Sequence, residues 1–438
     1  MLKRSWGCAL SVALLACALG FGVYYLPPVY ERLAWRVKNL QARVQYALDP
    51  PQEVVFLPQE QVETLVQPTL QAIQASLTLP PPPSATPSPT PPPGPTDTPT
   101  HTSTVTPTPT ALPETVVLSG VKHEYQKFNN CGPANLSMAL TFWGWQGDQL
   151  DTRAYLRPNY EVDDKNVDPA EMVVFVNSQT PFQALARIGG DLDTLKRLIA
   201  GGFPVLVEKG HDPPDDDWMG HYVLLNGYDD ARARFISQDS LILPDLPVPY
   251  QVLEQVEWRD FNYAFLVVYP PERQAEVLAL LGPFADPAYG YRAAAERALQ
   301  ESAALSGREQ YFAWYNRGAS LVYLEDYAGA AQAFDAAFGL YAALPQDVRP
   351  WRALWYRSEP YAAYYHTARY QDVVNLANTA LSTLNEPVLE EAYYWRGLAK
   401  EALGDLEGAI QDLQKAAALN PNYAPAAEQL QRLGVITP

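Results

Sequence analysis

With 438 residues, the chain is long enough for two or three domains, and its 47% of apolar residues is typical of globular proteins. The formal net charge of -18 excludes a nucleic-acid-binding class, because neutralising phosphates needs clustered Lys and Arg side chains. Of its three cysteines, Cys8 and Cys17 lie in an apolar N-terminal run and only Cys131 lies elsewhere, which excludes a disulfide framework.

The N-terminal segment predicts a membrane anchor. Lys3 and Arg4 are followed by an uncharged run over residues 6–26. A helix of this length spans a bilayer and exceeds the apolar core of most signal peptides. We therefore predict an uncleaved signal anchor, a transmembrane helix over residues 1–27, in preference to a cleaved signal peptide.

Two further segments separate this anchor from the folded part of the chain. Residues 28–79 contain two short helical patterns and are predicted to be a juxtamembrane helical spacer. Residues 80–113 contain 14 Pro and 10 Thr among 34 residues, so they predict a disordered linker that cannot form a core. At about 3.1 Å per residue, this linker would reach roughly 100 Å as a semi-rigid stalk. Such a stalk favours domains outside the cytoplasm, although the basic residues after the apolar run favour the opposite orientation.

Residues 114–270 predict an α+β domain. Helical patterns come first, over residues 133–143, in DPAEMVVFVNSQ and in GGDLDTLKRLIAGG. Four short runs rich in Val, Tyr and Phe follow and predict strands, namely FPVLVEK, HYVLLNGYDD, ARFISQDS and NYAFLVVYP. Helices followed by closely spaced strands indicate an antiparallel sheet with the helices segregated from it.

Residues 285–438 are rich in alanine and contain three copies of one helical pattern. Small residues at two repeated positions allow paired helices to approach closely, and a larger residue at a third fills the groove between pairs. The equivalent positions are Gly318, Tyr361 and Gly397; Ala330, Val373 and Ala409; and Phe334, Ala377 and Leu413. This pattern resembles the tetratricopeptide repeat, with a degenerate middle copy and a capping helix in AYGYRAAAERALQESAAL. The resemblance implies an all-α solenoid that binds a peptide or protein partner in a concave groove.

Cys131 directly precedes a Gly-Pro pair and a helical pattern. Proline suits the first turn of a helix, because its missing N–H would have no helical acceptor there. The thiol then lies beside the backbone N–H groups of that turn, which together with the helix dipole favour the thiolate. A lone cysteine is more often a small buried side chain, but this position favours a nucleophile.

A thiolate nucleophile needs a general base, and His221 is the best placed of the five histidines. It begins a strand that turns near residue 230 into the next strand. In an antiparallel hairpin centred there, residues whose numbers sum to 460 face each other, so Asp239 is predicted to lie opposite His221 and orient its ring. A one-residue slip would move Asp239 to the other face, so the prediction requires a turn with an odd number of residues. The alternatives are Asp229 and Asn226 as orienting residues and His123 as the base.

The stretches YQKFNNCGPANLSMAL, GHYVLLNGYDD and ISQDS resemble the bacteriocin-processing peptidase family, cysteine-peptidase family 39, in its stand-alone form. The resemblance implies a papain-like fold in which Cys131 is the nucleophile, His221 the general base and Asp239 the residue that orients it. It also implies that the amide of Gln126 helps to bind the oxyanion, a donor worth about 3 kcal/mol. No GxxxxGK[ST] phosphate-binding loop of a fused transporter ATPase occurs in the sequence, which argues against removal of double-glycine leaders.

Two acidic stretches have some features of metal sites. The loop HDPPDDDWMGH carries His211, three aspartates over residues 215–217 and His221, but its histidine spacing fits no familiar ligand set, and we interpret it as a solvated loop. The stretch DDKNVDPAE begins like an EF-hand at Asp164, yet Pro169 replaces the required glycine. Neither stretch predicts a metal site, and we expect no cofactor.

Together these features predict a membrane-anchored cysteine peptidase that cleaves peptide or protein substrates through an acyl-thioester. The repeats are expected to bind a protein partner or substrate, and the catalytic and repeat domains to lie outside the cytoplasm. The alternative is a membrane-tethered binding scaffold whose papain-like domain has lost activity. A hydrolase and an acyltransferase would share the same site residues.

Overall fold

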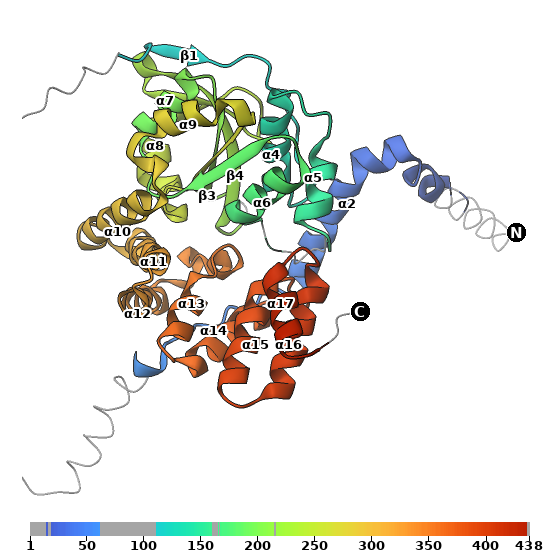
Figure 1. The fold of residues 1–438 in the computed structure, drawn as a ribbon. Coiled ribbons are helices and arrows are strands. Elements are labelled where there is room, and N and C mark those ends of the chain that lie inside the picture. Colours follow the sequence, from blue (N-terminus) through green and yellow to red (C-terminus); the bar gives the residue numbers. More distant parts are fainter. Residues whose placement is uncertain are drawn as a thin grey trace, which may run out of the picture.

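The computed structural model shows an α+β domain packed against a helical domain (Figure 1). The residues that it describes are 15, 19–61, 111–159, 165, 167–213 and 216–435. Most of the predicted membrane helix and nearly all of the predicted Pro/Thr-rich linker lie outside these residues. Within them, no helix combines the length and the apolar character that crossing a membrane requires.

Helix α2 (Pro27–Leu48) lies where the first helical pattern of the predicted spacer placed a helix. It begins with two prolines, which the first turn of a helix tolerates. All but the first residues of the second pattern lie outside the described part of the chain. After α2 the backbone runs without regular structure to residue 58 and lies against the helical domain.

The α+β domain is built on an antiparallel sheet with the strand order β2-β7-β3-β4-β5-β6, and β1 pairs with the end of β4 that lies near its turn. Its strands are β1 (Thr115–Val117), β2 (Gln183–Arg187), β3 (Val205–His211), β4 (Met219–Asp229), β5 (Arg234–Gln238), β6 (Leu246–Pro249) and β7 (Phe265–Tyr269). The four predicted strands are thus confirmed as β3, β4, β5 and β7. Strands β1, β2 and β6 were not predicted. They are only three to five residues long, and sequences such as QALAR and LPVP show no clear alternation of apolar and polar residues.

Helices cover both faces of this sheet. They are α4 (Cys131–Phe142), α5 (Gln149–Leu156), α6 (Pro169–Gln179), α7 (Leu192–Ala200), α8 (Tyr250–Val252) and α9 (Gln274–Leu281). Successive strand residues alternate between two apolar clusters: Leu206 and Leu224 face α4 and α6, whereas Val205 and Val223 face α7 and α9. Because both faces are buried, the central strands read as continuous apolar runs.

The helical domain contains the three predicted helix pairs. Its helices are α10 (Pro287–Ala304), α11 (Gly307–Tyr323), α12 (Tyr327–Ala343), α13 (Glu359–His366), α14 (Tyr370–Ser382), α15 (Glu390–Ala402), α16 (Leu406–Leu419) and α17 (Ala424–Arg432). The pairs are α11 with α12, α13 with α14, and α15 with α16, and α10 packs before the first of them. The repeat pattern read from the sequence is therefore confirmed.

The degenerate middle repeat keeps its packing by exchanging a small and a large residue. In the first repeat, a Cβ atom on Gly318 would lie only 2.7 Å from the ring of Phe334, so glycine is required beside the phenylalanine. In the second repeat, the equivalent residues are Tyr361 and Ala377, and both are buried. The large side chain has moved from the second helix of the pair to the first, which preserves the volume that fills the contact.

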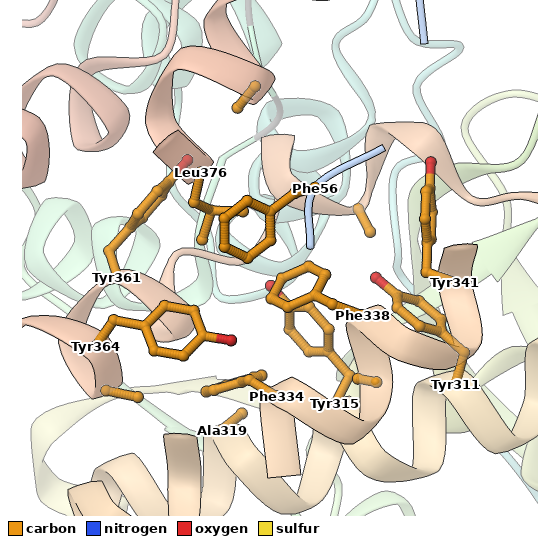
Figure 2. Packing of buried hydrophobic residues seen from close by; sticks show 14 of the residues in the cluster. Phe56, Tyr311, Tyr315, Ala319, Phe334, Phe338, Tyr341, Tyr361, Tyr364 and Leu376 are labelled. Atoms are coloured by element: carbon orange, nitrogen blue, oxygen red, sulfur yellow. The ribbon is translucent and has the colours of Figure 1, made fainter. Parts of the chain in front are cut away.

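The two domains share apolar core. Trp218 and Phe261 of the α+β domain stack with their ring centroids 5.7 Å apart, and the ring of Phe312 from α11 lies 5.1 Å from Trp218. The same cluster extends through the repeat helices to Phe56 of the N-terminal segment (Figure 2). The repeats are therefore packed directly onto the strand that leads to His221.

Candidate active site

Cys131 is the first residue of α4, two residues before the start that the sequence predicted. Pro133 is the third residue of this helix, where the missing N–H would have had no acceptor within the helix. The side chain is 4% exposed and lies at the edge of the apolar cluster between α4 and the sheet. The predicted nucleophile thus stands in the first turn of a helix that is buried on nearly all sides.

His221 and Asp239 lie beside this thiol. The Nε2 atom of His221 is 3.0 Å from Oδ1 of Asp239, and the thiol of Cys131 is hydrogen-bonded to the same ring. With the Nε2–H donating to the carboxylate, Nδ1 is the ring nitrogen available to the thiol. His221 is 2% exposed and Asp239 is 1% exposed, so the interaction is shielded from water. The structure brings these three predicted residues together.

The predicted register of the hairpin is wrong, although it led to the right residue. Leu224 pairs with Gln238, so facing residues near the site sum to 462 rather than 460, and the turn contains four residues rather than an odd number. A β-bulge at Asn226 adds one residue to β4 and restores the face that an even turn would have reversed. Asp239 therefore lies on the same face as His221 but diagonal to it.

The alternative candidates have other partners. Asp229 lies near the turn, with Oδ2 2.7 Å from the guanidinium of Arg232. Asn226 accepts a hydrogen bond from the amide of Gln238 at 3.3 Å, and Nδ1 of His123 lies 3.2 Å from Oε1 of the same glutamine. The ring that contacts the thiol is that of His221.

The electrostatics favour an ion pair between Cys131 and His221. Burial alone raises the pKa of the Cys131 thiol, but the hydrogen bond and the charge of His221 outweigh it, so this pKa lies below its ordinary value. Burial alone lowers the pKa of His221, but hydrogen bonds to Asp239 and Cys131 raise it to about 9. Both shifts of pKa favour the thiolate–imidazolium pair over the neutral thiol and imidazole.

Asp239 is held as a carboxylate by several donors. Its Oδ1 accepts hydrogen bonds from the backbone N–H groups of Leu241 at 2.9 Å and Ile242 at 3.0 Å, in addition to the bond from His221. Burial raises the pKa of Asp239, but the His221 ring and these two N–H groups lower it to about 2. The carboxylate thus fixes the ring and also the turn that follows β5.

Gln126 is tied to the site by a network that the sequence did not reveal. Its backbone N–H donates to the carbonyl of Ser240 at 2.8 Å, and the Ser240 hydroxyl donates to Oε1 of Gln126 at 2.8 Å. Nδ2 of Asn135, one turn after Cys131 on α4, donates to the Ser240 hydroxyl at 3.0 Å. The Ser240 hydroxyl therefore holds the side-chain amide of Gln126 by its oxygen.

Asn135 joins the nucleophile helix to the strand of the base. Its buried Nδ2 lies 2.9 Å from the carbonyl oxygen of Cys131 and 2.8 Å from that of Tyr222, the residue after His221. A spacing of four residues from the cysteine places it on the same helix face, which was the only signal in the sequence that pointed to it.

The loop before the nucleophile is also held by polar side chains that the sequence did not identify. Oε1 of Gln149 accepts hydrogen bonds from the Lys127 backbone N–H at 2.7 Å and from the Asn130 amide at 3.0 Å. The Arg157 guanidinium is hydrogen-bonded to the carbonyl of Asn129, and its charge also lowers the pKa of the thiol.

The acidic loop before β4 is exposed to solvent at Asp216 and Asp217, as predicted, and it also contacts the repeat domain. The indole N–H of Trp351 donates to Oδ2 of Asp217 at 2.9 Å, and Asp216 forms an ion pair with Arg352 at 3.2 Å. Asp215 lies outside the described residues. These two contacts hold the loop, which leads directly into β4, the strand that carries His221.

The EF-hand-like stretch contains a helix cap. Asp168 is the N-cap of α6 and accepts a hydrogen bond from the Ala170 N–H at 2.7 Å, in a capping box with Glu171. Asp164 and Asn166 lie outside the described residues. A capping role accounts for the acidic residue before Pro169.

Three carboxylates elsewhere are close enough together to hold a metal ion. They belong to Glu171, Glu390 and Glu391, at the junction of α6 with the last repeat. Nζ of Lys165 lies 3.4 Å from Glu171 and from Glu390 and also contacts Glu391. The lysine ammonium therefore occupies the place where a cation would bind.

A thiol in the first turn of a helix, an imidazole on a neighbouring strand and a carboxylate behind it form an arrangement typical of papain-like cysteine-dependent enzymes. Residues 118–261 match the family model described as the Peptidase_C39 like family, and residues 390–423 match the tetratricopeptide repeat. Both resemblances are thereby confirmed. The chain contains a C39-like cysteine-peptidase fold followed by tetratricopeptide repeats.

Two solved structures are similar to part of this chain. One is a C39-like peptidase from Bacillus anthracis, with 18% identity and a TM-score of 0.31, over 36% of this chain and 98% of that chain. The other is Xylellain, a cysteine protease from Xylella fastidiosa, with 16% identity and a TM-score of 0.28, over 36% of this chain and 86% of that chain. No curated protein matches the sequence.

Proposed function

We propose that the chain is a cysteine peptidase that cleaves peptide or protein substrates through an acyl-thioester on Cys131. The observation that carries this proposal is the continuous hydrogen-bonded chain from the Asp239 carboxylate through the His221 ring to the thiol. The pKa directions support it, because a thiolate is the attacking form and an imidazolium can protonate the leaving group.

The reaction follows from these positions. The Cys131 thiolate attacks the carbonyl carbon of the scissile amide, the C–N bond breaks, and the His221 imidazolium gives its proton to the leaving amine. A water molecule then loses a proton to His221 while its oxygen attacks the thioester, which releases the acid product and restores the thiolate–imidazolium pair. The backbone N–H of Cys131 and the Gln126 amide are the proposed donors to the oxyanion in both steps.

The surface beside the site favours substrates with apolar side chains near the cleaved bond. Tyr125 is 61% exposed, and Leu241, Ile242 and Leu243 are also exposed. The main-chain hydrogen bond from Gln126 to the residue before Leu241 places these side chains next to each other. An exposed apolar patch at a catalytic site is a typical binding surface for substrate side chains. Profiling with a peptide library tests this preference.

Labelling with a thiol-directed activity probe tests the catalytic proposal. The full chain is compared with Cys131→Ala and with His123→Ala as a control histidine outside the proposed triad. We expect labelling and peptide turnover in the wild type and the control and none in Cys131→Ala. If the wild type neither reacts with the probe nor turns over any peptide of the library, the scaffold without activity is the correct alternative.

We also propose that residues 1–27 anchor the protein in a membrane and that the folded domains lie outside the cytoplasm. The uncharged run over residues 6–26 and the Pro/Thr-rich composition of residues 80–113 support this location. Protease added to intact cells should cut within residues 80–113. Protection of that segment in intact cells, with cleavage after lysis, would contradict the proposed orientation.

Tetratricopeptide repeats generally bind peptides or protein segments. We therefore propose that the repeat domain holds a protein segment.

A further inference from the structure

Residues 49–61 lie along the repeat helices, without regular structure to residue 58 and with a helical turn over residues 59–61. The backbone N–H of Gln52 donates to the carbonyl of Thr383, at the C-terminal end of α14, at 3.0 Å. The backbone N–H of Gln59 donates to Oδ1 of Asp372, near the start of the same helix, at 2.9 Å. The segment therefore runs antiparallel to α14, with main-chain hydrogen bonds at both ends of the helix.

Phe56 is the apolar anchor of this segment. Its side chain is 5% exposed and packs edge-on against Phe338 of α12, with ring centroids 5.0 Å apart, and against Tyr364 of α13 at 6.1 Å. Figure 2 shows its ring entering a recess between Phe338, Tyr361 and Leu376. Three helices of two successive repeats thus surround one aromatic ring, as in a peptide-binding pocket.

Glu53, three residues before Phe56, is the charged anchor. The hydroxyl of Tyr341 donates to its carboxylate at 2.6 Å, and the guanidinium of Arg349 lies 3.4 Å away. The side-chain amide of Gln61, at the other end, is hydrogen-bonded to the backbone carbonyl of Asp335. The segment therefore meets apolar, charged and main-chain partners in one groove.

The segment fills this groove almost completely. Only a small hollow of about 30 Å³, with room for no more than a few water molecules, remains beside it. Val54 and Phe56 of the segment line this hollow together with Tyr311, Trp351 and Leu354 of the repeat domain. The segment is thus packed closely against the repeat helices.

We propose that residues 49–61 are the peptide ligand that the repeat domain binds, with Phe56 and Glu53 as its two anchors. In consequence, the chain is fixed to the folded body both at residue 61 and again at Pro113, whose carbonyl accepts a hydrogen bond from the hydroxyl of Tyr228.

Cleavage of the full chain between the two attachment points tests this proposal. A recognition sequence for a specific protease is inserted within residues 80–113 of a Cys131→Ala chain that carries an N-terminal affinity tag. After cleavage, the tag is captured and the rate at which the C-terminal fragment dissociates is measured. The assay does not depend on catalysis, so its failure is distinct from failure of the proposed peptidase activity.

We expect the C-terminal fragment to stay bound and a synthetic peptide of residues 49–61 in excess to prevent its recapture. Phe56→Ala should weaken retention roughly 100-fold, as loss of a buried aromatic ring does, and Glu53→Gln roughly tenfold, as loss of a charged hydrogen bond does. Gln52→Ala is the matched control, because its exposed side chain is lost while its main-chain bond remains.

Two outcomes would overturn the proposal. One is immediate separation of the wild-type fragments, or equal retention of wild type and both anchor variants. The other is that the fragments separate only when the repeats unfold, as measured by circular dichroism, and that the peptide does not compete. The segment would then be part of the repeat core. If Phe56→Ala lowers the melting temperature of the uncut chain, Glu53→Gln still distinguishes these cases.

Discussion

Ser240→Ala tests whether the Ser240 hydroxyl positions the oxyanion donor. The hydroxyl donates to Oε1 of Gln126 at 2.8 Å and accepts from Asn135 at 3.0 Å. Its removal leaves Asn135 with two carbonyl acceptors, at 2.8 Å and 2.9 Å, so no buried donor is orphaned. We therefore expect a loss of folding stability of only about 1 kcal/mol.

The catalytic effect should be larger than the structural one. Without the hydroxyl, the Gln126 amide loses the bond that fixes its orientation, which is worth about 1.5 kcal/mol and corresponds to a roughly tenfold lower kcat. KM should change little, because the oxyanion exists only in the transition state. Gln126→Ala removes the donor itself, about 3 kcal/mol, and should lower kcat roughly 100-fold or more.

A double-mutant cycle separates positioning from an independent role. If Ser240 acts through Gln126, the double variant should be no slower than Gln126→Ala alone, since the oriented group is already gone. The assay is steady-state turnover of a fluorogenic peptide, with the melting temperature of each variant measured in parallel. Additive effects, roughly 1000-fold in the double variant, would refute the positioning role.

Three further predictions concern charge. As pH rises through about 9, His221 loses the proton needed by the leaving amine, so kcat/KM should fall tenfold per pH unit there and rise again on return to neutral pH. Asp239→Ala removes the carboxylate that raises this pKa, so the alkaline limit should move to lower pH and turnover should fall roughly 100-fold, whereas a change in rate without a shift of the profile would contradict that role. Burial raises the pKa of the Glu391 carboxyl, which lies beside Lys165, from the ordinary value of 4.5 to about 8. Between these two pH values the carboxyl therefore keeps its proton in the folded chain and loses it in the unfolded chain. This group therefore costs stability increasingly from pH 5 to 8, and thermal unfolding of Glu391→Gln should show ~1–3 kcal/mol less loss of stability over that range.

The sequence singled out Cys131 and His221 because their signals are local. A Gly-Pro pair after Cys131 places a helix start, and HYVLLNGYDD is recognisable as a buried strand beginning at His221. The strand boundaries were found to within three residues for the same reason, since apolar runs and flanking Gly, Pro or Asp bound each strand.

Asp239 was identified through two departures from ideal geometry that cancel. The turn has an even number of residues, which by itself would have placed Asp239 on the wrong face, and the bulge at Asn226 corrects it. A bulge depends on which backbone groups find partners, here the carbonyl of Asn226 accepting from the N–H of Leu118, a residue far away in sequence. No pattern within the hairpin encodes that contact.

The positioning residues were missed because their partners are distant in sequence. Asn135 binds the carbonyl of Tyr222 and the hydroxyl of Ser240, which are 87 and 105 residues away. An asparagine inside a helix or a serine after an aspartate has no distinctive local pattern, and either is usually a solvated or capping residue. Only the packing of α4 against the sheet gives them their function.

The repeat domain supports the candidate site, because it packs against the start of β4, the strand that carries His221. A Cβ atom on Gly220 would lie 2.7 Å from the ring of Phe261 and 3.0 Å from that of Tyr356 in the repeat domain, so His221 is preceded by a residue with no space for a side chain. Trp351, which clamps the loop before this strand, also lines the groove that holds residues 49–61.

This arrangement restricts where a substrate can approach. The side of β4 that faces the repeats is closed by apolar contacts, whereas the turn after Asp239 exposes Leu241 and lies next to the exposed Tyr125. For the proposed peptidase, this turn is the expected side of approach for a substrate. The groove that holds residues 49–61 lies along α14, on the repeat side, so a segment bound there does not enter the proposed site. Trp351 contacts both this groove and the loop before β4 and is the residue through which the two surfaces are connected.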